Sequence, residues 1–134
     1  MANEAIIVEL LGNAGDPIEF TVAEGTDKPK LSIMKLLDTR NATLSSADGD
    51  NFAGIAAMEK IGGDGSTTMS CYTHGIFDLV DSGAGITFGD KVTIGGVNKI
   101  KTAAAGEAET GQILGVALET IAAGGRGQIL IGGW

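Results

Sequence analysis

Short runs of alternating apolar and polar residues recur along this chain. Residues 17–22 read Pro-Ile-Glu-Phe-Thr-Val, the period of two expected when one face of a strand is buried. Glycine, proline or polar turns separate this run from later apolar ones. The pattern predicts an all-β chain, with further strands over residues 31–36, 67–72, 75–80, 86–94, 98–102 and 127–131.

Residues 52–60 and 112–123 carry a mixed signal. Their alanine, methionine, glutamate and lysine content favours a helix, whereas Gly54 and Gly115 favour strands that run into glycine turns. We predict strand for most of both, and at most one or two short helices in the chain. Residues 38–51 are predicted to form a long polar loop.

The two halves of the chain resemble each other. The run that begins at Gly54 matches the run that begins at Gly115, apart from one extra alanine. Upstream, five residues align with five others at one constant spacing: Ile18, Val22, Gly25, Met34 and Leu36 with Ile76, Val80, Gly83, Val92 and Ile94. Two copies are too few for a solenoid, so we predict an internal duplication within a small pseudo-symmetric β-barrel or β-clip-like domain.

Residues 1–16 are separable from the rest. Residues 5–11 are almost continuously apolar and are followed by a glycine-containing polar turn. The segment is either a first strand of the domain or an arm that adds to the edge of a partner's sheet. Residues 17–134 are predicted to form a single β domain.

Composition and charge narrow the function. The chain has a formal net charge of −8 and no basic cluster, whereas nucleic acids and anionic membranes require a positive surface. Aromatic residues make up only 4% of the chain and 22 residues are glycine, so the core is built from small side chains and self-association would bury more area. The lone Cys71 excludes an intramolecular disulfide, and the absence of a basic leader predicts synthesis in a reducing cytoplasm.

The search for catalytic residues is negative. His74 and Cys71 lie close in the sequence but without a third group to orient them, which favours a histidine at a strand end. Glu59 and Glu119 occupy matching positions in the two copies and fit a solvated strand face as well as a carboxylate pair. We therefore predict no enzyme, no small-molecule substrate and no cofactor.

Two loops have superficial similarity to ligand sites. Residues 48–51 (Asp-Gly-Asp-Asn) lack the spacing of a calcium loop, and we interpret them as a polar turn. Residues 62–66 and 124–127 are rich in glycine but lack the lysine and the helix of a phosphate loop. We predict hairpin turns there, and no metal site.

Several motifs resemble a known family. They are the opening Met-Ala-Asn-Glu-Ala, the Gly-Asp-Lys-Val of residues 89–92, and residues 106–119, followed by Gly-Gln-Ile-Leu-Ile at 127–131. This chain is similar to the small head decoration (cement) proteins of tailed bacteriophages and prophages. The resemblance is strongest over residues 75–131 and looser elsewhere. Residues 27–31 depart from the proline-then-glycine turn of that family, so the local turn there does not follow from the resemblance.

The resemblance implies a structural viral protein of the virion surface. Such proteins are small β-barrel or β-clip-like domains, commonly homotrimers, that bind the major capsid protein at threefold or quasi-threefold sites of the mature head and stabilise it. The capsid-binding segment would then be the apolar N-terminal run, by strand addition. Apart from the resemblance, tryptophan is enriched at interface hot spots, so Trp134 either anchors the oligomer interface, or packs on its own domain or stays loose. The predicted capsid-binding residues are Ala5, Ile6, Ile7, Val8, Leu10 and Leu11.

Two alternatives belong to other classes. A phage tail, fibre or adhesion module would share the β-rich, glycine-rich and acidic composition, and would differ in its location on the virion. A nucleotide hydrolase of the dUTPase type would need a Gly-Arg-Ser turn, and residues 125–127 read Gly-Arg-Gly.

Overall fold

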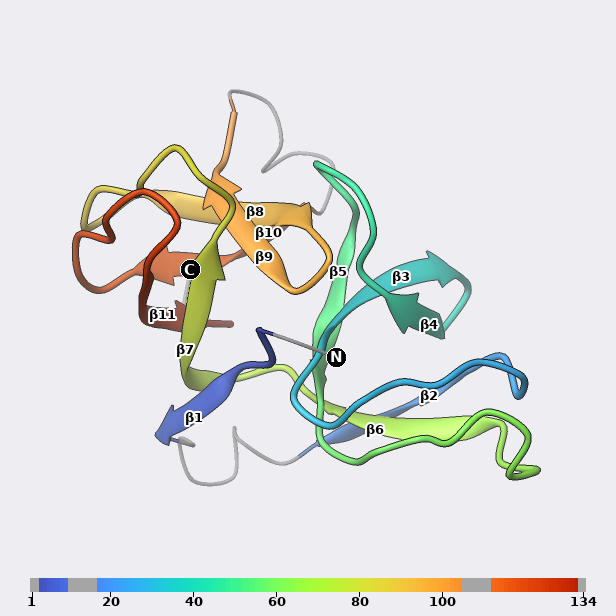
Figure 1. Cartoon of the computed structure of the whole chain (residues 1–134). Coiled ribbons are helices and arrows are strands. Elements are labelled where there is room, and N and C mark those ends of the chain that lie inside the picture. Colours follow the sequence, from blue (N-terminus) through green and yellow to red (C-terminus); the bar gives the residue numbers. More distant parts are fainter. Residues whose placement is uncertain (1–2, 10–16, 105–111, 133–134) are drawn as a thin grey trace.

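The computed structural model describes residues 3–9, 17–104 and 112–132, and its regular elements are all β-strands (Figure 1). This confirms the predicted all-β class, and no helix occurs in the described ranges. In those ranges, therefore, no helix is long and apolar enough to cross a membrane.

Residues 18–72 close a first barrel. Its strands follow one another around the barrel in the order β2-β4-β3-β5-β6. Closure comes from a parallel contact between β2 and β4, in which Thr21 pairs with Asn41, while the other neighbours are antiparallel. The strands are β2 (Ile18–Thr21), β3 (Ile33–Asp38), β4 (Asn41–Leu44), β5 (Phe52–Ala56) and β6 (Thr68–Tyr72).

Residues 75–131 close a second barrel with the same connectivity. The order is β7-β11-β10-β8-β9, again closed by a parallel contact, here between β7 and β9. The additional strand β1 (Ile6–Glu9) pairs antiparallel with β7 at the edge of this sheet. The strands are β7 (Gly75–Asp81), β8 (Lys91–Gly96), β9 (Lys99–Thr102), β10 (Ile113–Ala117) and β11 (Arg126–Ile131).

The matching topology confirms the predicted duplication and shows that each copy closes a barrel of its own. Gly54 and Gly115 recur for a physical reason. A Cβ at Gly54 would lie 2.7 Å from the carbonyl oxygen of Tyr72, and a Cβ at Gly115 would clash in the same way with Leu130. The sequence alignment of the two copies agrees with the structure for β3 and β8. For β2 and β7 it is one residue out, because the structural counterpart of Thr21, which pairs with Asn41, is Val80, which pairs with Lys99.

Two predicted boundaries were wrong. Strand β4 lies inside residues 38–51, which were predicted to be loop, because Ala42 is buried and the polar residues around it pair with β3. The strand predicted over 86–94 begins only at Lys91. Ile86 makes only a single bridge, to Ile121. Gly89, with φ 85°, then bends the chain between Ile86 and the start of β8 at Lys91.

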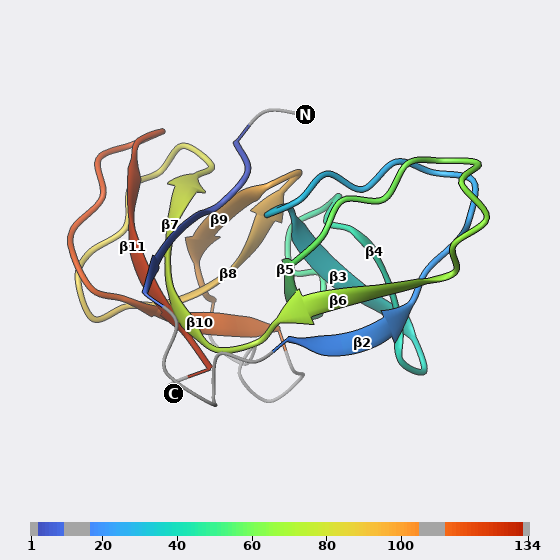
Figure 2. The same ribbon diagram turned by 90° about the horizontal axis from the view of Figure 1, so that it is seen from below.

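The two barrels lie side by side and share apolar packing (Figure 2). The first barrel encloses its own small core, whereas Ile33 and Ile55 on its outer face join the core of the second barrel. The ring centroids of Tyr72 and Phe77 are 5.8 Å apart across this junction. The inner core of the first barrel consists of Phe20, Val22, Met34, Ala42, Ala53, Ala56, Met69 and Cys71.

Candidate interaction surface

The N-terminal apolar segment is a strand of the protein's own sheet. Ile6 pairs with Asp78 and Ile7 with Phe77, so residues 6–9 follow the first of the two predicted alternatives. Ala5 is buried, and its N–H donates to the carbonyl oxygen of Leu31 (2.6 Å). Leu10 and Leu11 lie outside the described residues, as does Trp134.

The outer side of β1 is apolar and open. Ile6 is 50% exposed and Val8 is 43% exposed, although both are β-branched residues of the kind that usually pack on a neighbour. β1 pairs with β7 only, so its other edge has no strand beside it in the described part of the chain. Natural sheet edges commonly carry lysine, proline or a short blunted strand, and the Ile-Ile-Val-Glu sequence of β1 has neither lysine nor proline.

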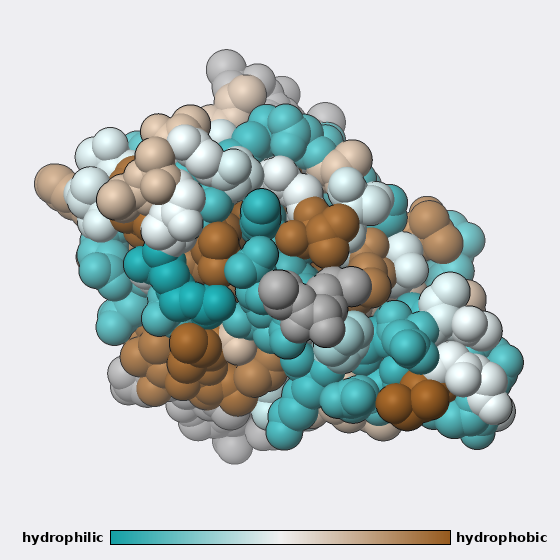
Figure 3. Space-filling model, viewed as in Figure 1, coloured by the Kyte–Doolittle hydropathy of each residue, from teal (hydrophilic) through white to brown (hydrophobic). Residues whose placement is uncertain are grey.

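This apolar surface continues across the second barrel. Val116 pairs with Leu130, which pairs with Ile76, and all three side chains are half-buried. In the space-filling view a brown cluster lies at the lower left, where β1 crosses the molecule in Figure 1 (Figure 3). We call Ile6, Val8, Ile76, Val116 and Leu130 the apolar face of the second barrel.

A small charged group borders this face. The Arg126 guanidinium donates from Nη1 to the carbonyl oxygens of Glu4 (3.2 Å) and Asp78 (3.1 Å), and so ties the start of β1 to β7. Burial raises the pKa of Asp78, and Glu119 adds to the rise while Arg126 opposes it. Asp78 and Glu4 each hold one buried carboxylate oxygen without a hydrogen-bond partner among the described residues.

The structure does not assemble the residues considered for catalysis. Cys71 lies in the core of the first barrel, where burial raises the pKa of its thiol to about 12. His74 lies outside that core, in the segment between the barrels, with Nδ1 3.4 Å from Thr73 Oγ1. Glu119 accepts the N–H of Gln128 in the second barrel, whereas Glu59 belongs to the β5–β6 connection of the first.

The glycine-rich and acidic loops are turns. Asp50 Oδ2 accepts the N–H groups of Ser46 (3.0 Å) and Ala47 (2.9 Å), which lowers its pKa against the opposing effect of burial. Gly63 and Gly124 have φ values of 84° and 73°, as expected of hairpin turns. No group of three potential metal ligands occurs among the described residues.

Two hollows mark the surface. One of about 310 Å³ lies between the barrels, lined by Phe52 and Leu114 together with His74 and Gly132. The other, about 190 Å³, lies beside the β3–β4 end of the first barrel and is lined in part by Arg40 and Phe20. Neither was predicted, because such hollows form between segments distant in the sequence.

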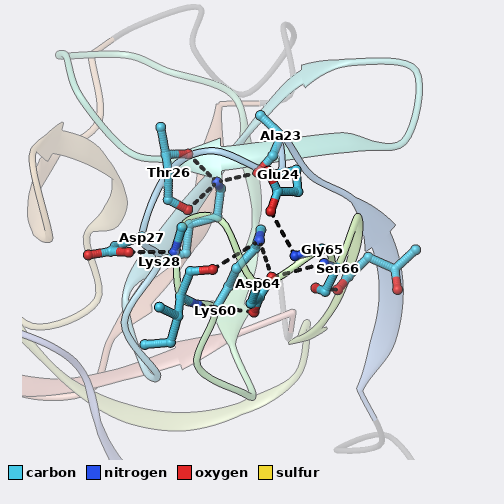
Figure 4. A network of polar contacts seen from close by, with 12 residues as sticks. Ala23, Glu24, Thr26, Asp27, Lys28, Lys60, Asp64, Gly65 and Ser66 are labelled. Carbon is cyan, nitrogen blue, oxygen red and sulfur yellow. Dashed lines mark hydrogen bonds and ion pairs between the residues drawn. The ribbon is translucent and has the colours of Figure 1, made fainter.

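Sequence reasoning also missed two buried lysines. Lys28 and Lys60 bridge each other through their backbones, as Ile86 and Ile121 do in the second barrel. The Lys28 ammonium donates to the carbonyl oxygens of Ala23 and Thr26 and to the Thr26 hydroxyl, and the Lys60 ammonium pairs with Asp64 at 2.7 Å (Figure 4). Their burial depends on the pairing of two loops, so the sequence of each loop alone carries no signal for it.

No protein-family model matches the sequence, and no curated protein matches it either. Among solved structures, the N base of the head fiber gp8.5 of bacteriophage phi29 is similar, with a TM-score of 0.56 at 16% sequence identity. The match covers 86% of this chain and 93% of that one. The two proteins share a fold. A match of that extent includes parts of both barrels, which supports the arrangement described above.

Proposed function

We propose that this protein is a bacteriophage structural protein that decorates the outside of the mature head. The likeness to the base of a phage head fiber, over nearly the full length of both chains, carries this proposal. The motifs shared with head decoration proteins support it independently. The protein is a homotrimer on this proposal, made in the host cytoplasm and bound to the major capsid protein at threefold or quasi-threefold sites of the capsid surface.

The proposed activity is mechanical and involves no reaction or cofactor. Each trimer contacts neighbouring capsid subunits and resists their separation, and many weak symmetric contacts add through multivalency. The first contact candidate is the edge of β1, whose backbone donors and acceptors are available for strand addition. Ile6 and Val8 would supply apolar contacts beside those hydrogen bonds.

The decisive experiment is co-sedimentation with expanded, undecorated heads from the same phage. We expect saturation at a copy number that matches the threefold and quasi-threefold sites. Failure of the folded protein to bind such heads would overturn the proposal.

Substitutions on the outer side of β1 test the contact itself. The double variant Ile6→Asp/Val8→Asp places two charges where an apolar contact is proposed, and we expect at least a tenfold weaker binding to heads. Deletion of the segment is less informative, because the buried Ala5 belongs to the core. Phe88→Asp is the matched control, since Phe88 is 68% exposed and lies outside the apolar face. Equal binding by the double variant would remove β1 from the contact.

A second candidate is the base of a fibre on the head, which the likeness to the N base of the phi29 head fiber favours. Electron microscopy of virions labelled with antibody against this protein separates the two. A decoration protein gives a low feature at many sites of the shell, whereas a fibre base lies at the foot of a projecting rod. Label on the tail would contradict both.

A further inference from the structure

The junction between the two barrels has a defined form. The β8–β9 hairpin end of the second barrel docks on the first barrel, where Ile33 N–H donates to Asn98 Oδ1 (2.8 Å). The Asn98 N–H donates to Ser45 Oγ (3.0 Å), and Gly49 N–H donates to the carbonyl oxygen of Ile94 (3.0 Å). Asn98 and Ile94 are fully buried as a result.

The first barrel carries an equivalent hairpin end that nothing covers in the described part of the chain. Leu36 and Arg40 of the β3–β4 hairpin occupy the positions of Ile94 and Asn98, and Arg40 repeats the left-handed backbone of Asn98 with φ 53° against 54°. Leu36 is 38% exposed and Leu37 is 57% exposed. Both hairpin ends point to the right in Figure 1, one towards the first barrel and one towards solvent.

The surface that receives the docked hairpin also has an equivalent. On the first barrel the hairpin meets Ile33, which belongs to the cross-strand row Ile33, Ile55 and Tyr72 that packs against the core of the second barrel. The register places Lys91, Val116 and Leu130 in the same row of the second barrel. The last two belong to the apolar face defined above, and both are half-buried.

We propose that the β3–β4 end of one copy docks on the part of the apolar face formed by Val116 and Leu130, on the second barrel of the next copy. This contact repeats between chains the junction that joins the barrels within a chain. The capsid contact proposed above uses the other part of this face, Ile6 and Val8. Within each chain, the β8–β9 end is already docked on the first barrel. The β3–β4 end and the row of Val116 and Leu130 are the equivalent pair of surfaces, and in the described part of the chain they do not meet each other. The partner is therefore a second copy of this chain.

The contact uses two different surfaces, so it is heterologous, and such contacts close into rings when the rotation is cyclic. A ring of three chains would hold six barrels in pseudo-equivalent positions. The ring size rests on the trimer of the proposed function, whereas the junction does not. Leu36 and Leu37 stand where the second barrel has Ile94 and Gly95, so the open end offers more apolar surface than its internal counterpart.

Light scattering after size-exclusion chromatography tests the junction without capsids. We expect three times the chain mass for the unmodified protein, and the mass of one chain for Leu37→Asp and for Leu130→Asp. Phe88→Asp is the control and should remain trimeric. Circular dichroism checks that each variant is folded, and Val116→Ser serves in place of Leu130→Asp if the latter unfolds. A monomeric unmodified protein, or variants that keep its mass, would overturn the junction.

Mixing the two monomeric variants tests its direction. Leu37→Asp retains an intact face and Leu130→Asp retains an intact hairpin end, so we expect the mixture to form dimers with one chain of each kind. An interface with twofold symmetry would give no such complementation.

Cysteine cross-linking tests which residues of the two copies meet at the junction. Arg40 and Lys91 are the counterparts of Asn98 and Ile33, which touch inside the chain. In the double variant Arg40→Cys/Lys91→Cys we expect oxidation to link chains into covalent trimers, and neither single variant to link beyond background. The buried Cys71 does not compete. Dimers from a single variant would contradict the head-to-tail contact, and open chains longer than three would overturn the closed ring. Capsid binding by a protein that fails these tests would leave the decoration role standing without this junction.

Discussion

Lys28 and Lys60 form a backbone bridge in the first barrel at the place where Ile86 and Ile121 form one in the second. Lys28 and Lys60 are almost fully buried, as Ile86 and Ile121 are. Burial lowers the pKa of Lys28 first, the neighbouring Lys60 adds to the effect, and Asp27 opposes it. Charged side chains are rarely buried unless oxygen atoms surround them, and here loop carbonyls, a hydroxyl and Asp64 supply those atoms.

The second barrel provides the replacement residues for a test. Because desolvation of buried charges often exceeds what their contacts return, we expect Lys28→Ile/Lys60→Ile to fold and to be equal to or up to about 3 kcal/mol more stable than the unmodified protein. Urea unfolding followed by circular dichroism measures this difference. A loss of stability would show that the ammonium contacts outweigh the apolar packing seen at Ile86 and Ile121.

The lowered pKa of Lys28 also predicts a pH dependence. The folded state releases the Lys28 proton at a lower pH than the unfolded state, whose pKa is near 10.5. Between those two values the unfolded state binds more protons, so the contribution of Lys28 to the free energy of unfolding rises with pH. Urea unfolding between neutral and alkaline pH, compared with Lys28→Ile, isolates this contribution. An unchanged difference between the two proteins across that range would contradict it.

At the scale of elements, Asn98 is one of the residues that hold the β8–β9 hairpin on the first barrel. Asn98 accepts the N–H of Ile33 and holds a left-handed conformation that asparagine tolerates better than most residues. Asn98→Ala leaves a buried N–H without an acceptor and strains the turn, and we expect a loss of about 2–4 kcal/mol. Asn98→Gly removes the side-chain contacts but tolerates the left-handed turn, so its smaller loss separates the strain from those contacts. Equal stability of the alanine variant and the unmodified protein would show that the hairpin is held by other contacts.

The clearest strand prediction rests on a period of two between turns: residues 17–22 alternate in this way, and β2 formed there. β4 was missed because the alternation of Asn-Ala-Thr-Leu is only four residues long and lies within a polar stretch. Ala42 is its one buried residue, and the strand is held by pairing with β3 and with Thr21 of β2. The position of β1 was left open for a similar reason, since an apolar strand has the same sequence whichever sheet edge it joins. The extent of the site beyond residues 5–11 was not predictable, because Val116 and Leu130 meet only after folding.

At the scale of the whole molecule, the shared core couples the two barrels. Ile33 and Ile55 lie on strands of the first barrel, but their side chains pack in the core of the second barrel. The first barrel therefore loses buried area if the second unfolds, and we expect one cooperative transition for both. Calorimetric and van't Hoff enthalpies should agree, and labelling of Cys71 should share the midpoint of the circular dichroism change. Separate midpoints would show that the barrels unfold independently.

The pairing of β1 with β7 sets an order of events during synthesis. Residues 6–9 leave the ribosome before both barrels, yet their partner follows about seventy residues later, after the whole first barrel has been made. The first barrel has all five of its strands by then, while β1 and the outer-face residues Ile33 and Ile55 still lack the second barrel as a neighbour. We therefore expect nascent chains to be prone to aggregation, and to need a chaperone, from the emergence of Tyr72 until the strands of the second barrel follow.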